Sequence, residues 1–574
     1  MAKTEQAEPA KDTAGGSASS ANPMYLLIPL ALAQLINAYD TTAMNVAVSK
    51  VVPSLHTTVA GVQAGITIYS LVMAAFMITG SKIGDIWGRK KTFMLGVTMY
   101  GVGALITAFS RNLGMMVTGW SLLEGLGSAL MIPAIFALVS SMLPPGRQRL
   151  KGFALIGSAA AAGAALGPLL CGFWATVVTW RASFLSEVAV VVVVLLLHKR
   201  LAVEEDPNRK KPQLDALGAV LSALGLAILV MGFLQASTYG WLTARVPFKV
   251  GGKVIIPKGG ISPVIPFVIA GLLVLGLFVL WQRHRTNAKK EPLVNLGIFK
   301  GRAVAIGLPV VLMLMFMQAG MLFICPVFLQ MSLGQSPLVS GLTILPLTVF
   351  LILFSQVAAK LNKVQPRKLI MIGMVLIPLG LMLIWWLLED KPSALQMIPG
   401  LIVVGVGIGL VNAPLLNLVQ SSLPAEESGE ISGVNRAFSN LGGSLGTAIA
   451  GAVLMSVLIS SFSGLLLKNP VIPQAEKQKI ESKLAQDART VSDKQVRSYL
   501  AAKSFNPRVG TALYDINQKS RNKALLTALL AVGVLGVLGF LFSIFLPRVQ
   551  NEEADEEAGE PAERVSERPA GQPT

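Results

Sequence analysis

Long apolar runs alternate with short polar segments along most of this chain. A helix needs about twenty mostly apolar residues to cross the hydrocarbon core of a membrane. Fourteen segments approach this requirement, and we expect each to form a transmembrane helix. They cover residues 24–48, 62–82, 92–110, 113–142, 152–176, 183–198, 215–236, 264–282, 303–330, 338–361, 367–388, 394–420, 430–462 and 522–546. The pattern therefore predicts an all-α membrane protein with fourteen spans.

Basic residues collect in every second connecting segment. They follow the second, fourth, sixth, eighth and tenth predicted spans, for example at Arg89, Lys90 and Lys91, whereas the loop after the ninth span has no charge. Short loops rich in Lys and Arg stay on the cytoplasmic side of a membrane. We therefore expect a multi-pass protein of the cell inner (cytoplasmic) membrane with both termini in the cytoplasm.

Two longer connections fall on the opposite side. Leu242–Pro263 contains the glycine pair Gly251 and Gly252 between β-favouring residues, which predicts a small hairpin. Ser463–Asn522 is long and polar, and its sequence favours a helix over Gln474–Arg489. This long loop either gates an exit path or forms an external cap without a specific role.

The composition agrees with a membrane protein. Hydrophobic residues make up 53% and charged residues 14% of the chain, and the mean hydropathy is +0.64. The net charge of +18 is explained by the basic loops, so we expect no nucleic-acid partner. The two cysteines, Cys171 and Cys325, lie in apolar runs and exclude a disulfide framework. Residues 1–22 and the acidic segment 548–574 have the composition of disordered cytoplasmic tails.

Three acidic residues lie inside predicted spans, where a charged side chain is costly. At 1.5 Å per residue, Asp40 and Glu124 lie about 14 Å and about 16 Å from the outer ends of their spans. They would face each other if those spans are neighbours. Burial favours the protonated form of a carboxyl group, so such residues can exchange protons or hold a cation. We take Asp40 and Glu124 as proton-coupling residues. Glu187, about one turn inside its span, is a third candidate for which a structural role is equally open.

A short polar turn joins the second and third predicted spans. Asp85 can cap the following helix and bond to an arginine such as Arg89, and Gly88 allows the helix ends to approach. Arg436 lies one or two turns into the thirteenth span, where it either pairs with Glu430 or extends to the interface.

The fifth predicted span is rich in small residues. Its glycines permit close helix packing, and its proline removes one backbone hydrogen bond and kinks the helix. The residues concerned are Gly163, Gly167, Pro168 and Gly172.

Taken together, these features resemble the 14-spanning drug:proton antiporter branch of the major facilitator superfamily, of the multidrug efflux type. Asp40–Ala47 is similar to its first-helix signature, Ser81–Lys90 to its loop motif and Gly163–Gly172 to its antiporter motif. Further matches lie at Trp180, Arg181, Phe184, Leu329, Gln330, Gly341, Leu345, Pro346, Arg436, Gly442, Gly443 and Gly446. The resemblance covers roughly residues 24–462 and 522–546.

The resemblance implies two six-helix bundles around a central cavity, with two further helices inserted between them. The expected boundaries are 23–200 and 291–547 for the bundles and 201–290 for the inserted pair. Rocking of the bundles would then expose the cavity to each side in turn. The residues Asp85, Gly88, Arg89 and Arg436 would form a cytoplasmic gate that closes one state. The expected activity is export of hydrophobic compounds, cationic by preference, in exchange for protons. We expect no cofactor, a proton gradient as energy source, contact with the lipid bilayer and a monomer.

The chain departs from the branch at several positions. Where the fourth helix of that branch has R-x-x-Q-G, this chain has Ser121 in place of the arginine and Glu124 in place of the glutamine. Ser81, Ile86 and Cys171 also differ from the motifs. The proton relay of the branch therefore does not transfer intact. Either the two acids share the proton role, or one takes the proton and the other a cationic substrate.

Several polar or adaptable side chains lie in spans that would line the cavity. An amide in the middle of a membrane needs a partner, which makes Gln318 the strongest of them, and methionine fills irregular apolar sites. Orientation toward lipid or neighbouring helices is the alternative for each. The candidate substrate cavity comprises Asn37, Asn45, Met317, Gln318 and Asn412.

Other classes of function have less support. The three histidines, His56, His198 and His284, fall in loops or at interfaces, and the chain has neither metal-ligand nor nucleotide-binding spacings. We therefore expect no enzyme, no catalytic residue and no metal site. Within transport, export of an endogenous lipid or secondary metabolite stays open, and uptake by symport is disfavoured by the fifth-helix motif. A receptor or scaffold on the same fold is the alternative from another class.

Overall fold

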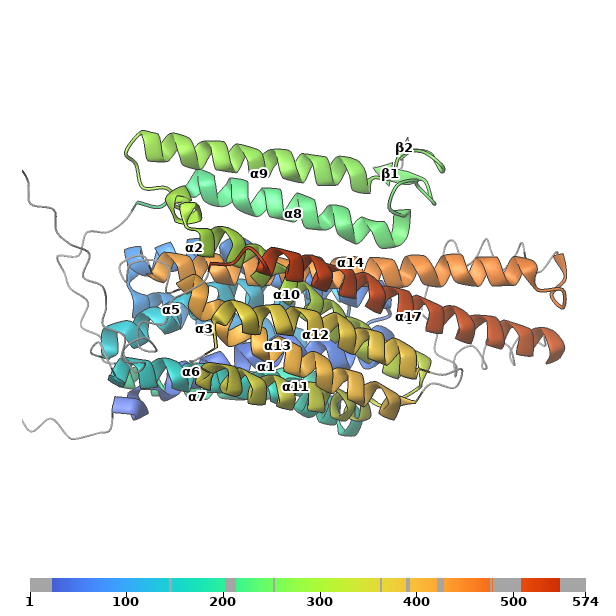
Figure 1. The fold of residues 1–574 in the computed structure, drawn as a ribbon, viewed down its shortest axis with the longest axis horizontal. Coiled ribbons are helices and arrows are strands. Elements are labelled where there is room, and N and C mark those ends of the chain that lie inside the picture. Colours follow the sequence, from blue (N-terminus) through green and yellow to red (C-terminus); the bar gives the residue numbers. More distant parts are fainter. Residues whose placement is uncertain are drawn as a thin grey trace, which may run out of the picture.

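The computed structural model describes residues 23–143, 147–201, 213–250, 253–361, 364–388, 393–420, 428–474, 477 and 507–547. Long helices run side by side along the longest axis of the molecule (Figure 1). Fourteen helical spans are present in these residues, which confirms the predicted fold class.

The spans follow one another along the chain as single helices, except for two that contain a π-helical segment. They are α1 (Ile28–Ser54), α2 (Val59–Trp87), α3 (Arg89–Ala108), α4 (Leu113–Met116) continued by η2 (Val117–Glu124) and α5 (Gly125–Met142), α6 (Arg147–Val177), α7 (Arg181–Leu196), α8 (Ala216–Tyr239), α9 (Val264–Asn287), α10 (Arg302–Val327) continued by η5 (Phe328–Ser332), α11 (Pro337–Lys360), α12 (Pro366–Leu387), α13 (Ala394–Gln420), α14 (Ser428–Lys468) and α17 (Pro507–Ser543). The segments η2 and η5 are the π-helical ones. Short 3₁₀ turns are η1 (Pro23–Leu27), η3 (Leu197–Arg200) and η4 (Leu296–Lys300).

Several helices begin at a side chain that caps their first turn. Thr58 accepts a hydrogen bond of 3.1 Å from the amide of Gly61 at the start of α2. Ser336 does the same for α11, accepting from Val339 at 3.2 Å. Such caps satisfy amides that have no partner within the helix. They explain why these helices start where the polar connections end.

Thirteen helices in the described residues are long and apolar enough to cross a membrane. The helix α1 is not among them because it carries several polar side chains within its length, including Gln34, Asn37, Asp40 and Asn45. All four are buried by neighbouring helices. Protein therefore surrounds the polar face of α1, as a membrane interior requires.

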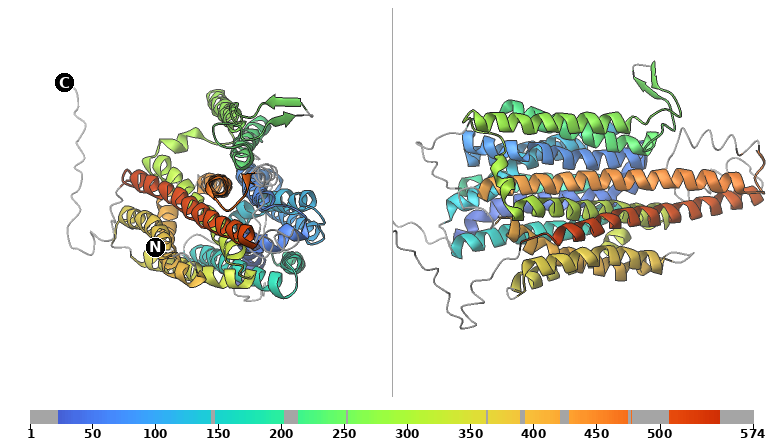
Figure 2. Two further views of the ribbon diagram at one scale, coloured as in Figure 1. Left: turned by 90° about the vertical axis from the view of Figure 1, so that its right-hand side faces the viewer. Right: turned by 45° about the horizontal axis from the view of Figure 1, so that its top comes forward.

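The predicted ends of the last two spans are wrong. The helix α14 continues to Lys468 and α17 begins at Pro507, fifteen residues before the predicted start. Both extend beyond the other helices at one end of the molecule (Figures 1 and 2). Their extensions pack through buried apolar residues such as Leu466 and Ile516. Only one face of each extension is apolar, so a search for continuous apolar runs misses it.

The two long connections are partly described. The predicted hairpin is confirmed, with β1 (Phe248–Val250) antiparallel to β2 (Lys253–Ile256). It lies at the end of the molecule toward which α14 and α17 extend (Figure 1). The predicted helix Gln474–Arg489 lies almost entirely outside the described residues, as do the two terminal tails.

Close packing of α6 against α1 depends on glycine. A Cβ atom at Gly163 would meet the carbonyl oxygen of Leu35, and one at Gly167 would meet the hydroxyl of Thr42. Both contacts are closer than real Cβ atoms allow. The hydroxyl of Thr42 also donates to the carbonyl of Ala164 at 3.3 Å. These contacts fix the position of α1 on the N-terminal bundle.

Hydrogen bonds also join the two bundles. The Gln63 amide of α2 donates to the carbonyls of Thr447 and Ala448 on α14 at 3.1 and 3.0 Å. The Gln330 amide of η5 donates to the carbonyl of Val46 on α1 at 2.8 Å. Gly341 of α11 lies against the carbonyl of Pro168 on α6. These contacts lie toward the end where α1, α6 and α10 finish.

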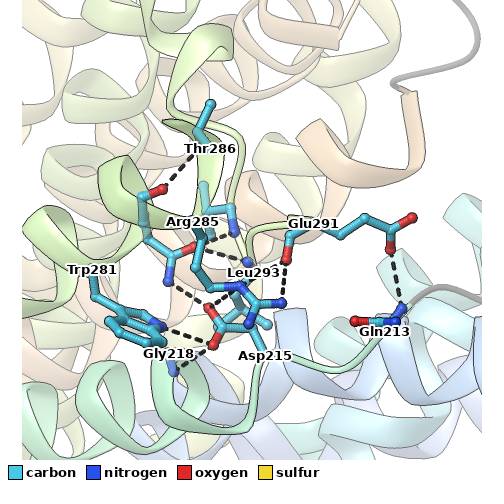
Figure 3. Close-up of polar contacts among 10 residues, drawn as sticks. Gln213, Asp215, Gly218, Trp281, Arg285, Thr286, Glu291 and Leu293 are labelled. Carbon is cyan, nitrogen blue, oxygen red and sulfur yellow. Dashed lines mark hydrogen bonds and ion pairs between the residues drawn. The ribbon is translucent and has the colours of Figure 1, made fainter. Parts of the chain in front are cut away.

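The helices α8 and α9 form a pair at one side of the bundles (Figures 1 and 2). Asp215, which caps α8, fixes the pair at one end (Figure 3). Its carboxylate accepts hydrogen bonds from Gly218, Trp281 and Gln282 at 3.0, 2.9 and 2.8 Å. Arg285 lies 3.8 Å from the same carboxylate. Burial raises the pKa of Asp215, but these three donors and the arginine outweigh it and hold the pKa below its usual value.

Substitution of a contact glycine tests the packing that positions α1. We expect Gly163→Ala to lower the free energy of unfolding by about 1–3 kcal/mol, because the added methyl group meets the backbone of α1. Gly157 lies on the same helix with no atom near its added Cβ, so Gly157→Ala is the matched control and should be neutral or slightly stabilising. Unfolding of the purified protein in detergent measures both. Equal effects would contradict the packing described.

The Asp215 network gives a pH-dependent prediction. We expect Asp215→Asn to lower the free energy of unfolding by about 1–3 kcal/mol at pH 7, because it loses a charge-assisted acceptor for buried donors. Since the folded-state pKa lies below the unfolded value of about 3.9, the stabilisation is fully present above that value and is lost as pH falls through the folded-state pKa. Unfolding at pH 7 and at acidic pH should therefore show the wild type and the variant converging. The exposed Asp515 supplies the control Asp515→Asn, and a difference that persists unchanged in acid would contradict this role of the carboxylate.

Candidate functional site

Three acidic side chains meet in the core of the N-terminal bundle. Asp40 comes from α1, Glu124 from η2 and Glu187 from α7. One carboxylate oxygen of each lies within 4.8 Å of the others. Their exposed fractions are 0%, 0% and 1%. We call these three residues the acid cluster.

Local helix geometry aims each acid inward. Glu124 ends the π-helical segment η2, whose wider turn also directs Trp120 into the core. Such segments occur in helices mainly at functional sites. The segment is anchored to α2 by the Ser121 hydroxyl, which donates to the carbonyl of Gly65 at 2.8 Å. Closer approach of α3 is possible because Gly103 faces the backbone and side chain of Glu124.

Each acid is approached by neutral hydrogen-bond donors only, and Asp40 by two of them, Tyr69 and Trp120. The indole nitrogen of Trp120 donates to both oxygens of Asp40, at 2.8 and 3.0 Å. The Tyr100 hydroxyl donates to Glu187 Oε2 at 2.6 Å. The Thr107 hydroxyl donates to Glu124 Oε1 at 3.3 Å. The second oxygen of each glutamate, Glu124 Oε2 and Glu187 Oε1, is buried without a hydrogen-bond partner.

The electrostatics of the acid cluster follow from these contacts. Within the described residues, no ion pair joins any of the three carboxyls to a basic side chain. Neighbouring carboxylates in a medium of low dielectric constant repel each other strongly, so they share protons instead of ionising together. Protons of such a group belong to the cluster as a whole. The arrangement is therefore chemically able to hold one or more protons.

A further shell of polar groups surrounds the acid cluster. Asn37, one turn before Asp40, donates to the hydroxyl of Ser128 at 2.7 Å. The Tyr39 hydroxyl pairs with that of Ser183 at 2.6 Å. Carboxylate oxygens also suit hard metal cations. Calcium and magnesium take six or more oxygen ligands, however, and the predicted absence of a metal stays a prediction.

The predicted gate residues lie at the end of the molecule opposite to the contacts of Gln63 and Gln330. Asp85 and Arg89 approach to 3.9 Å, and the guanidinium of Arg89 donates to the carbonyl of Ala137 at 3.0 Å. Gly88 between them has φ of +104°, a conformation that favours glycine. Arg436 of the C-terminal bundle lies over the ring of Phe136, 5.8 Å from its centre. A cation over an aromatic ring is an attractive contact, and here it joins the two bundles.

The predicted antiporter-motif residues divide between two interfaces. Gly163 and Gly167 face α1. Pro168 and Gly172 face α11, where a Cβ at Gly172 would lie 2.7 Å from the carbonyl oxygen of Pro337. The motif therefore packs α6 against α1 of its own bundle and against α11 of the other bundle.

The predicted cavity residues do not share one environment. Asn37 and Asn45 are buried within the N-terminal bundle, although the side-chain oxygen of Asn45 has no hydrogen-bond partner. Met317 is buried and lies close to Gly536 on α17, inside the C-terminal bundle. Gln318 and Asn412 are half-buried. Their role in a substrate site stays a prediction.

Sequence reasoning missed two residues that organise the site, and it named Gln330 only as a motif match without its contact. Trp120 and Tyr100 are the donors to the acid cluster, and Gln330 joins α10 to α1. A signal existed only for Trp120, which precedes Glu124 by four residues and so lies on the same face of a helix. The contact of Tyr100 with Glu187 depends on how α3 packs on α7, and no sequence spacing reveals it.

Comparison with known proteins agrees with this architecture. The Major Facilitator Superfamily matches residues 30–447. The chain belongs to that family. It is a multi-pass membrane transporter and not an enzyme.

Three curated relatives illustrate the branch. The chain is 28% identical to a probable actinorhodin transporter of Streptomyces coelicolor, over 74% of this chain and 71% of the relative. It is 27% identical to the tetracenomycin C resistance and export protein of Streptomyces glaucescens, over 76% of each. It is 26% identical to the multidrug resistance protein Stp of Mycobacterium tuberculosis, over 75% and 76%. By distant homology the chain thus stands among the drug and antibiotic efflux transporters of the superfamily, which confirms the resemblance to that branch.

Solved structures share the fold. The peptide transporter POT in complex with sulfate has a TM-score of 0.57 at 16% identity, covering 92% of this chain and 96% of that one. A bacterial homologue of the lysosomal transporter Spinster, in an inward-facing and unoccupied conformation, has a TM-score of 0.57 at 15% identity and covers 93% and 100%. At such identities the likeness concerns the fold alone.

Proposed function

We propose that this transporter exports hydrophobic, preferentially cationic, compounds across the cytoplasmic membrane in exchange for protons. The observation that carries the proposal is the acid cluster: three buried carboxyls from three helices, with no ion pair to a basic side chain in the described residues. Such a group binds and releases protons as its surroundings change. The relatives named as a probable actinorhodin transporter and as a tetracenomycin C resistance and export protein support drug or antibiotic efflux.

Coupling between protons and substrate is indirect in this proposal. The acid cluster is closed off from the surface, so a substrate does not touch the carboxyls in this conformation. The helix α1 connects the two processes, because Asp40 is buried while the next residue, Thr41, is exposed. The same helix contacts the other bundle through Val46. A change of protonation at Asp40 therefore acts on substrate and on bundle contacts by moving α1.

The conformation fits one stage of an alternating-access cycle. Hydrogen bonds from Gln63 and Gln330 join the bundles toward the end where α1 finishes. In the proposed orientation, with both termini in the cytoplasm, this is the external end. The preference for cations follows from the net negative charge that the acid cluster gains when it releases a proton.

Export of an endogenous secondary metabolite is the second candidate. Its specific support is the relative named as a probable actinorhodin transporter. The two candidates differ in substrate and share the proton-coupled mechanism. A non-transporting receptor has no feature in the described residues that favours it over transport.

The test is transport in proteoliposomes with an imposed proton gradient. Lipophilic cations, neutral compounds and anions are added in turn while the lumenal pH is recorded. We expect substrate-induced proton movement with cations, and a loss of at least about tenfold in Asp40→Asn, Glu124→Gln and Glu187→Gln, because each removes a carboxyl group that holds the exchanged proton or interacts with the acid that holds it. The control Asp515→Asn, an exposed acid on α17, should transport normally.

Three other results would count against this function. Proton movement that survives all three cluster substitutions would contradict the proton-coupling role of the cluster. Movement with neutral or anionic compounds alone would contradict the preference for cations. No proton movement with any compound would overturn proton-coupled drug export.

A further inference from the structure

Trp120 has an unusual place in the acid cluster. Its side chain is 1% exposed, and its indole nitrogen lies 2.8 and 3.0 Å from the two oxygens of Asp40. Most buried indole N–H groups have a hydrogen-bond partner. Here that partner is the carboxyl group of Asp40, approached by one donor lying between both oxygens.

The chemistry of the indole group favours one protonation state of Asp40. An indole nitrogen donates and never accepts a hydrogen bond. A donor is bound more strongly by a charged carboxylate than by a neutral carboxyl group. Trp120 therefore favours the ionised form of Asp40 without adding a positive charge of its own.

The two glutamates differ from Asp40 because each has a donor at one oxygen only. Glu124 Oε2 and Glu187 Oε1 are buried without a donor, which is costly for an ionised carboxylate. A protonated carboxyl group, in contrast, carries its own O–H donor and can direct it to a neighbouring carboxylate. Since oxygens of all three acids lie within 4.8 Å of each other, Asp40 is the natural acceptor.

The position of Trp120 is fixed by its neighbours. Its ring stacks on Tyr69 of α2, with centroids 5.1 Å apart and planes inclined by 9°. The next residue, Ser121, is tied to the backbone of α2 at Gly65. The donor is thus held by α2 and η2 while Asp40 belongs to α1, so movement of α1 changes this hydrogen bond.

We infer that Trp120 is a positioning residue whose indole N–H keeps Asp40 as the one anionic member of the acid cluster and leaves the protons on Glu124 and Glu187. The inference rests on the proposed proton-coupled function and deepens it. It names Asp40 as the acid that gains and loses a proton during transport. In this arrangement the negative charge of Asp40 is stabilised by a neutral hydrogen-bond donor and by the protons on the two glutamates. A basic side chain is not needed for that purpose.

Other titratable groups face Asp40 from each helix packed against it. Tyr39 lies on the same helix, and the others come from α2, α3, η2, α6 and α7. They are Tyr39, Tyr69, Tyr100, Glu124, Cys171 and Glu187. Each is uncharged or acidic, so none supplies a positive charge to Asp40. The groups that favour its ionised form are neutral donors, the Tyr69 hydroxyl and the Trp120 indole, and the indole alone lies within hydrogen-bond distance of both oxygens.

The first test is the pH profile of transport in proteoliposomes. Trp120→Phe keeps an aromatic ring on Tyr69 and removes the N–H donor. We expect the pH of half-maximal substrate-driven proton release to rise by about one to two pH units, because the ionised form of Asp40 loses its donor. Trp120 replaced by 3-benzothienylalanine, a tryptophan isostere with sulfur in place of N–H, should give the same shift without a loss of volume.

The matched control is Trp180→Phe. Trp180 is equally buried, but its indole nitrogen has no hydrogen-bond partner. The change therefore makes the side chain smaller by the same amount without removing a hydrogen bond. Its pH profile should equal that of the wild type. A wild type that antiports protons, with Trp120→Phe and the isostere unshifted, would overturn the inference and leave the proposed function intact.

A second measurement is independent of transport. Infrared spectroscopy of the purified protein at neutral pH detects the C=O band of protonated buried carboxyls. We expect this band to weaken in Glu124→Gln and in Glu187→Gln and to persist in Asp40→Asn. A band that weakens in Asp40→Asn alone would overturn the inference, whatever the proteoliposomes show.

Discussion

Repulsion among three carboxyl groups in a closed, low-dielectric core is the constraint on which the other features of this protein depend. Charges a few ångströms apart repel far more strongly in such a core than in water. The acid cluster, with no ion pair in the described residues and with neutral donors only, must therefore hold protons to exist. A change in the protonation of the cluster therefore affects the packing of the helices that carry the three acids.

In the proposed mechanism, the helix α1 transmits the state of that cluster. It has too many polar residues to count among the helices that are apolar enough to cross a membrane. Its polar side chains are buried against neighbouring helices instead. Glycines on α6 let the two backbones approach closely, and Gln330 ties α1 to the other bundle. A helix held this tightly on several sides passes on a local change as a displacement of the whole element. In this mechanism, substrate can be exchanged for protons although the substrate does not contact the carboxyl groups.

Much of this was predictable from the sequence, for identifiable reasons. The fourteen spans follow from apolar runs, because a membrane demands them of any helix that crosses it. The convergence of Asp40 and Glu124 follows from equal depth in two spans, and the structure brings them together. Glu187 joins them although its short distance from a predicted span end left its role open. The donors Trp120 and Tyr100 depend on the rotation of η2 and on the packing of α3, which periodicity does not encode. The extensions of α14 and α17 were missed because their apolar residues form a one-sided stripe instead of a run.

In the proposed mechanism, substrate binding expels a proton from a closed acid cluster without touching it. The decisive experiment adds a lipophilic cation to the purified protein in weakly buffered detergent solution, at a pH below that of half-maximal proton release so that Asp40 carries a proton, and records the protons released on binding. We expect proton release by the wild type and none by Asp40→Asn, with binding of the cation retained in both because the substrate does not contact the carboxyl. Equal release by both proteins, or loss of cation binding in Asp40→Asn, would contradict this mechanism.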